Sequence, residues 1–123
     1  MFNPERRARK PSLLACLGAL LAATAIALSA YASHGAADPL AQQHLNIAAL
    51  YAFAHGAVLV ALGPRAQGAI AHLALYVLLL GVLLFSGSLA GGALWQWPTR
   101  LAPIGGTSMM AGWVLLAINA LRR

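Results

Sequence analysis

The residues best suited to chemistry in this chain are its four histidines, and one of them stands inside an apolar run. His55 lies in "LYAFAHGAVLVALG", residues 50–63, where Tyr51 is its main polar companion. Imidazole can ligate metals, carry protons, or donate and accept hydrogen bonds. If this segment is a helix, steps of three and four residues place His55 on one stripe with four other residues: His44, Ala48, Tyr51 and Leu62.

The composition indicates that a membrane surrounds this histidine. Of 123 residues, 61% are hydrophobic and 8% are charged, and the mean hydropathy is +0.77. That charged fraction is about a third of the usual share. Glu5 and Asp38 are the only acidic residues, so a charged, water-facing surface cannot be built. The lone cysteine, Cys16, can form no disulfide within the chain.

Four segments are long and apolar enough to cross a bilayer, which takes about 20 residues. They span residues 13–32, 45–62, 69–92 (in an apolar stretch that runs to 95) and 103–121. Helices are expected, because open strands would leave backbone groups unpaired in lipid. The sequence therefore predicts an all-α, four-helix transmembrane bundle with up-down-up-down topology. We expect one membrane domain over 1–123, which includes a basic cytoplasmic tail at 1–12.

The connectors are short and carry helix-start and interface signals. Asp38-Pro39 is typical of an N-cap followed by proline in the first turn, so the second helix is expected to begin near Pro39. Tyr31, Trp95 and Trp97 are expected at one membrane interface, where aromatic side chains anchor helices.

Charge predicts the orientation of the bundle. Four basic residues lie in "ERRARK", one is Arg65, and Arg122 and Arg123 end the chain, all on one predicted side; Arg100 alone is on the other. The positive-inside rule then predicts that both termini are cytoplasmic. The basic residues are therefore expected to set the orientation in the membrane rather than to bind nucleic acid. Reporter fusions at Arg123 and within "SHGAAD" should report opposite sides. A periplasmic C-terminus would rule out the four-span arrangement.

Small residues predict where helices approach closely, since packing in lipid depends on close contact and polar links. Gly87 and Gly91 of the third span are expected to face Gly105, Gly106 and Gly112 of the fourth in a tight hairpin. The first span has a row of alanines at four-residue spacing that predicts another smooth face: Ala15, Ala19, Ala23 and Ala27.

A polar residue in a membrane helix faces the bundle rather than lipid. His55 is therefore expected to be buried near mid-depth, with Thr24 of the first span as its hydrogen-bond partner. Desolvation disfavours the imidazolium, so we predict a neutral ring that fixes helix register. The alternative is a proton- or ligand-handling role, with Tyr51 and His55 lining a polar path.

The remaining chemistry is sparse. His34 and His44 are expected near Asp38 in a hydrogen-bonded loop; zinc or copper ligation by these three is an alternative whose spacing fits no specific metal motif. Haem needs a second histidine facing His55 at one depth, which only a dimer would supply. Proton-coupled drug export of the small multidrug type needs a membrane carboxylate, and none lies in a span. No nucleophile has a base and acid at credible spacing, so we predict no enzyme activity, cofactor or metal.

Several motifs resemble one family. "LFSGSL" followed by "LAPIGGTSMMAGW", together with "AYASHG" and "YAFAH", resembles the small membrane proteins called domain of unknown function 423, which include transmembrane protein 256-like proteins. The resemblance runs from about Ala19 to Leu121. His34 and Gly35 match the family's A-F-G-A-H-G motif, and Tyr51 and His55 match its second motif, where Ala52 replaces a glutamine. It implies four transmembrane helices and no established activity.

The sequence thus favours a small integral protein of the bacterial inner membrane that is a structural or accessory subunit. Its expected partners are the lipid bilayer and other membrane subunits or further copies of itself, not nucleic acid. The alternative is a small channel or carrier with a path past His55 and Tyr51.

Overall fold

The computed structural model describes residues 11–35 and 38–122, and within these it contains four long α-helices and no strand. They are α2 (Leu13–His34), α3 (Pro39–Leu62), α4 (Gly68–Trp95) and α5 (Leu101–Leu121), with a short 3-10 helix, η1 (Gly63–Arg65), between α3 and α4. Each long helix has the length and apolarity to cross a membrane. The predicted four-helix bundle is confirmed. The predicted tail lies outside the described residues except for positions 11 and 12.

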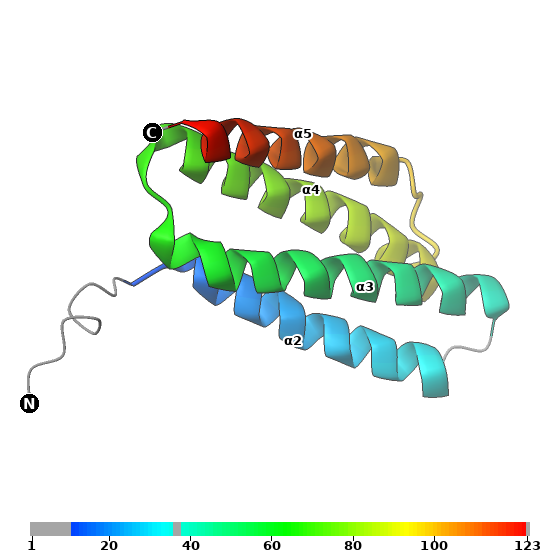
Figure 1. Ribbon diagram of the computed structural model, residues 1–123. Helices are drawn as coiled ribbons and strands as arrows, with labels where there is room; N and C mark the ends of the chain where they lie inside the picture. Colours follow the sequence, from blue (N-terminus) through cyan, green and yellow to red (C-terminus); the bar gives the residue numbers. More distant parts are fainter. Residues whose placement is uncertain (1–10, 36–37, 123) are drawn as a thin grey trace, which may run out of the picture.

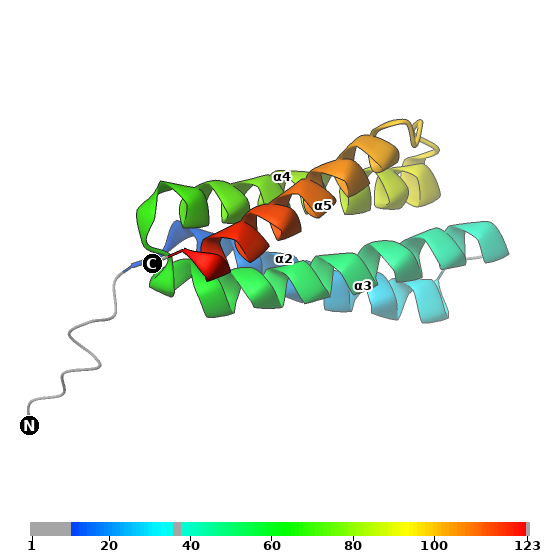
Figure 2. The same ribbon diagram turned by 45° about the horizontal axis from the view of Figure 1, so that its top comes forward.

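Successive helices run in opposite directions, so α2 begins and α5 ends at the same end of the bundle (Figure 1). Turned by 45°, the bundle shows two layers, with α4 and α5 in one and α2 and α3 in the other (Figure 2). The main contacts join α2 to α3 and α4 to α5, and α3 to α4. The fold is therefore two helical hairpins joined along α3 and α4.

Local sequence explains where the helices begin. The Ser12 side chain accepts a hydrogen bond from the Ala15 backbone N–H at 3.1 Å, and Asp38 Oδ1 accepts one from the Leu40 N–H at 3.1 Å. The predicted Asp38 cap is thus confirmed, and α3 starts six residues before the predicted span. Gly68, with φ +86°, permits the sharp entry into α4, because side chains rarely tolerate that backbone conformation.

Leucines from both hairpins form the largest core. Leu14, Leu59, Leu78 and Met109 represent the four helices in it. Towards the opposite end, alanines replace leucines: Ala25, Ala49 and Ala52 between α2 and α3 form one smaller cluster. The helices there can approach more closely, because alanine adds little bulk to a helix surface.

Close approach of α4 and α5 occurs at glycines, but not at all of those predicted. A Cβ on Gly105 would meet the Gly81 carbonyl oxygen at 2.6 Å, and one on Gly112 would meet Leu78 Cγ at 2.7 Å. Gly105 and Gly112 are therefore packing residues, as predicted, and their counterparts on α4 are Gly81 and Leu78.

Three of the predicted glycines do not have the facing glycines that were expected as their nearest neighbours. Gly87 is exposed and has nothing within 4 Å of an added Cβ. The three atoms nearest to an added Cβ on Gly91 all belong to the ring of Trp97 in the following connector, and an added Cβ on Gly106 meets only Phe85 Cδ1, at 3.8 Å. The contact face of α4 is turned so that Gly81 and Phe85 meet α5, which directs Gly87 outward.

The α2–α3 hairpin has its own glycine contact, which the alanine row did not predict. A Cβ on Gly18 would meet the Gly56 carbonyl oxygen at 2.6 Å, and one on Gly56 would meet the Gly18 carbonyl oxygen at 2.5 Å. The predicted alanine face was wrong: Ala15 is half-buried and the other three are exposed. The helix instead buries a stripe at four- and seven-residue steps: Leu14, Gly18, Ala25 and Ala32.

Among the described residues, three side chains donate hydrogen bonds to backbone carbonyls of neighbouring helices. Ser86 of α4 donates to the Ala48 carbonyl of α3 at 2.9 Å, and Ser108 of α5 donates to the Val77 carbonyl of α4 at 3.0 Å. Gln42 of α3 donates to the carbonyl of the α2 residue Ala32 at 3.0 Å. Each hydroxyl or amide thereby has a hydrogen-bond acceptor within the protein, which lipid tails could not provide.

Candidate functional site around His55

His55 is buried between the hairpins, with only 6% of its surface exposed. Its Nδ1 lies 2.9 Å from the carbonyl oxygen of Tyr51, one turn earlier in α3. Its Nε2 lies 3.1 Å from Nε1 of Trp113 in α5. The ring therefore connects α3 to α5, across the two hairpins.

The two neighbours determine the protonation state of the ring. A carbonyl oxygen can only accept, so Nδ1 must carry the proton; an indole N–H can only donate, so Nε2 must offer its lone pair. The hydrogen-bond pattern of His55 is thus that of the tautomer with the proton on Nδ1. An imidazolium would set an Nε2–H against the indole N–H and break the link to Trp113.

Aromatic rings enclose the imidazole. Tyr51 is stacked over it with ring centroids 6.0 Å apart, and Trp113 meets it edge-on at 5.9 Å. Tyr51 also contacts Phe85 of α4 at 4.8 Å. Tyr51 and Trp113 remain 39% and 45% exposed on the membrane-facing surface. The site is a hydrogen-bonded aromatic cluster with an apolar rim.

Thr24 is not part of this site, so the predicted hydrogen bond to His55 was wrong. The Thr24 hydroxyl donates to the Leu20 carbonyl at 2.9 Å and is exposed. A threonine in a membrane helix can satisfy its hydroxyl on the preceding turn without another helix. Because Gly18 meets Gly56, α2 lies against the side of α3 next to His55, and the imidazole turns towards α5 instead.

The other predicted polar residues do not converge. His34 is exposed at the end of α2, His44 is half-buried in α3, and Asp38 caps that helix. Within residues 11–35 and 38–122, no three His, Cys, Asp or Glu side chains are placed to hold a metal ion. His72 is exposed and bonds the Gly68 carbonyl through Nδ1 at 2.8 Å.

Three hollows in the structure lie away from His55. Three cavities of ≈ 530, 310 and 350 Å³ are lined by connector and helix-end residues or by the groove between α2 and α3. His55 and Tyr51 line none of these three. In the described part of the chain, every buried side-chain nitrogen and oxygen has a hydrogen-bond partner. None of these three cavities therefore opens onto His55.

Trp113 is the site residue that the sequence reasoning missed, although a signal existed. It precedes the end of α5 at Leu121 by eight residues, and His55 precedes the end of α3 at Leu62 by seven. Both helices end on the same side, so the two lie at matching depth (Figure 1). A tryptophan well inside a span needs a partner for its N–H, and His55 supplies it.

A double-mutant cycle should measure this link. We expect His55→Leu and Trp113→Phe each to destabilise the protein in detergent, and the double variant to lose less than their sum. The coupling should be about 0.6 kcal/mol and at most about 1.7, the range found for hydrogen bonds within membranes. Trp95→Phe, in the exposed Trp95–Trp97 pair, is the control for coupling with His55→Leu. If the effects of His55→Leu and Trp113→Phe simply add in the double variant, the hydrogen bond between the two residues is excluded.

The sequence was also compared with known families and proteins. A family described as "Protein of unknown function (DUF423)" matches residues 28–106, more than half of the chain. The chain belongs to the DUF423 family. The resemblance seen in its motifs is thus confirmed. The matched part of this DUF423 protein includes His34, His44 and His55 and ends before Trp113.

Relatives of this DUF423 protein carry names that state a membrane location. A "UPF0382 membrane protein" of Staphylococcus epidermidis is 34% identical over 113 residues, which cover 86% of this chain and 93% of the relative. Those of Staphylococcus saprophyticus and Staphylococcus haemolyticus are each 32% identical, covering 86% and 89% of this chain and 94% and 96% of the relatives. No solved structure matches. The chain is a membrane protein of a bacterial family.

Proposed function

We propose that this protein is a non-catalytic structural or accessory subunit of the bacterial cytoplasmic membrane, held in a larger membrane complex or in a homo-oligomer. The observation that supports this most is the closed state of His55. A proton relay or ligand site needs a nitrogen free to exchange partners, whereas both ring nitrogens here are engaged: Nδ1 with the Tyr51 carbonyl of its own helix, and Nε2 with Trp113 of α5.

The exposed faces of the helices fit a subunit that is surrounded by lipid or apolar partners. Large apolar side chains are exposed on each of the four helices, for example Ile26, Phe53, Leu80 and Val114. Water would not tolerate so much apolar surface on a monomer, but lipid and other spans do. Inter-helix serines bond to carbonyls within the fold and add no polar path.

Reconstitution separates this role from that of a channel or carrier. We expect proteoliposomes that contain the chain to pass protons and potassium ions no faster than empty vesicles do. In mild detergent, the native protein should elute as an assembly of fixed stoichiometry, and His55→Leu should leave that assembly intact. Flux that requires His55 would refute the subunit role and favour the channel.

A further inference from the structure

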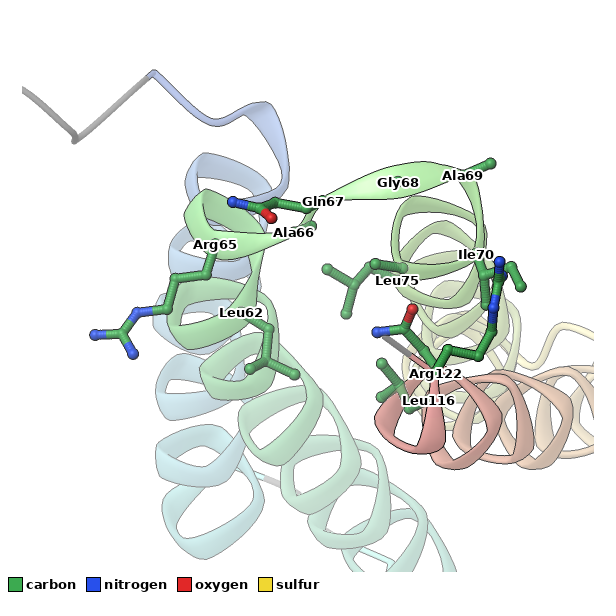
Figure 3. Close-up of a pocket in the computed structure, with 12 residues that line it drawn as sticks. Leu62, Arg65, Ala66, Gln67, Gly68, Ala69, Ile70, Leu75, Leu116 and Arg122 are labelled. Carbon is green, nitrogen blue, oxygen red and sulfur yellow. The ribbon is translucent and has the colours of Figure 1, made fainter.

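The largest of the three cavities lies at the end of the bundle where α3 ends, α4 begins and α5 ends. Its volume is ≈ 530 Å³, within the range of about 300–1,000 Å³ typical of ligand pockets. Leu62, Leu75 and Leu116 line the side towards the core (Figure 3). The cavity separates the two hairpins, with η1 and the end of α3 on one side and α4 with α5 on the other.

The mouth of the cavity is positively charged. Arg65 and Arg122 both line it, together with the amides of Gln67 and Asn119. Asp38 is the only acidic residue in the described part of the chain, and it caps α3 at the opposite end of the bundle. Among the described residues, no carboxylate side chain therefore lies in the wall to neutralise the two guanidinium groups.

The two arginines are placed differently. The side chain of Arg122 runs beside Ile70 of α4, whereas the guanidinium of Arg65 points away from the cavity (Figure 3). Arg122 therefore lines the cavity on the side of α4 and α5, and Arg65 lines it on the side of η1, so both raise the positive potential at its rim. The backbone N–H groups at the start of α4 add to that potential, since the Gln67 side chain does not cap the helix.

We propose that this cavity binds the headgroup phosphate of an anionic phospholipid, with an acyl chain along Leu75 and Leu116. The helix ends place the arginines where headgroups lie, and the leucines extend from them into the hydrocarbon. A guanidinium forms two parallel hydrogen bonds to phosphate oxygens. A zwitterionic lipid has the same phosphate, but its ammonium group would oppose the two arginines.

Such a lipid would bridge the hairpins at the end where the cavity separates them. Its phosphate would contact α5 through Arg122, and its chain would fill space between α3 and α4. Bound lipid should therefore stabilise the fold. The inference does not depend on which side of the membrane this end faces.

The test uses the full-length, delipidated chain with any tag at the N-terminus. Binding is followed by native mass spectrometry and by the shift in melting temperature. Phosphatidylglycerol, phosphatidylcholine and soluble glycerol phosphate are the three probes. We expect binding and stabilisation with phosphatidylglycerol and much less with the other two. Arg122→Gln should weaken phosphatidylglycerol binding about fivefold, the scale of one cation at an anionic lipid surface, and Arg65→Gln somewhat less.

Arg100→Gln is the matched control, because it removes one exposed arginine at the other end of the bundle. It should change binding less than twofold. Equal binding of phosphatidylglycerol and phosphatidylcholine would overturn the proposal, as would an equal loss in the Arg100 and Arg122 variants. Glycerol phosphate binding as tightly as the lipid would overturn the lipid assignment in favour of a soluble phosphate ester.

Discussion

Replacing Gly105 with leucine is expected to lower the free energy of unfolding in detergent by about 3 kcal/mol, the upper part of the range for overpacking. A side chain at this position would collide with the Gly81 carbonyl oxygen and with the backbone N and Cα of Phe85. Backbone atoms cannot rotate away as a side chain can. The α4 and α5 helices would have to separate, and the bond from Ser108 to the Val77 carbonyl would lengthen.

Gly87→Leu is the matched control, since it makes the same chemical change in the partner helix. An added Cβ at Gly87 meets nothing within 4 Å, so we expect a change within about 0.5 kcal/mol. Both variants can be measured by titrating the folded protein in mild detergent with a denaturing one. A large loss of stability in Gly87→Leu and a small one in Gly105→Leu would contradict the contacts described for α4 and α5. It would favour the helix contact through Gly87 that was expected from the sequence.

Gly18→Leu should have the second-largest effect, about 2 to 3 kcal/mol, by forcing α2 away from α3. The new side chain would meet the Gly56 carbonyl oxygen and the Leu59 Cβ. Ala19→Leu, at the next residue, adds comparable bulk on an exposed face and should be nearly neutral. The same detergent titration distinguishes them, and equal losses would mean that α2 packs through another face.

The sequence predicted the helices well because length and apolarity suffice for that purpose. A run of about 20 apolar residues with no charge must be a helix in lipid, and Asp38-Pro39 marked the start of α3 by its capping chemistry. Likewise, Gly105 and Gly112 were correctly expected at a helix contact, since glycine leaves room for a neighbouring backbone.

The faces of the helices were harder to predict, for a physical reason. In water the buried face of a helix is apolar and the exposed face is polar, but in lipid both are apolar. Small residues then occur on either face, so the alanine row of α2 and Gly87 of α4 appeared equivalent to real contact residues. Rotation of each helix about its axis depends on its neighbours and is not encoded in its own pattern.

The hydrogen-bond partner of His55 was also mispredicted, although the sequence contained a signal for the right one. Thr24 was chosen because it is polar and at similar depth, yet its hydroxyl is satisfied within its own helix. Trp113 instead carries its N–H at the end of a rigid indole ring, and that N–H finds its acceptor on another helix, at Nε2 of His55. Counting residues from the helix ends to find unsatisfied donors and acceptors at equal depth would have paired it with His55.

Determining the tautomer of His55 tests most directly whether a hydrogen bond between His55 and Trp113 joins the two hairpins. Nitrogen-15 NMR of the histidine-labelled protein at neutral pH distinguishes the two ring nitrogens, and His55→Leu assigns the signals. We predict a neutral ring with the proton on Nδ1 and a hydrogen-bonded lone pair on Nε2, with a change at Nε2 in Trp113→Phe. A proton on Nε2, or a ring that exchanges freely with water, would show that Trp113 does not close the site.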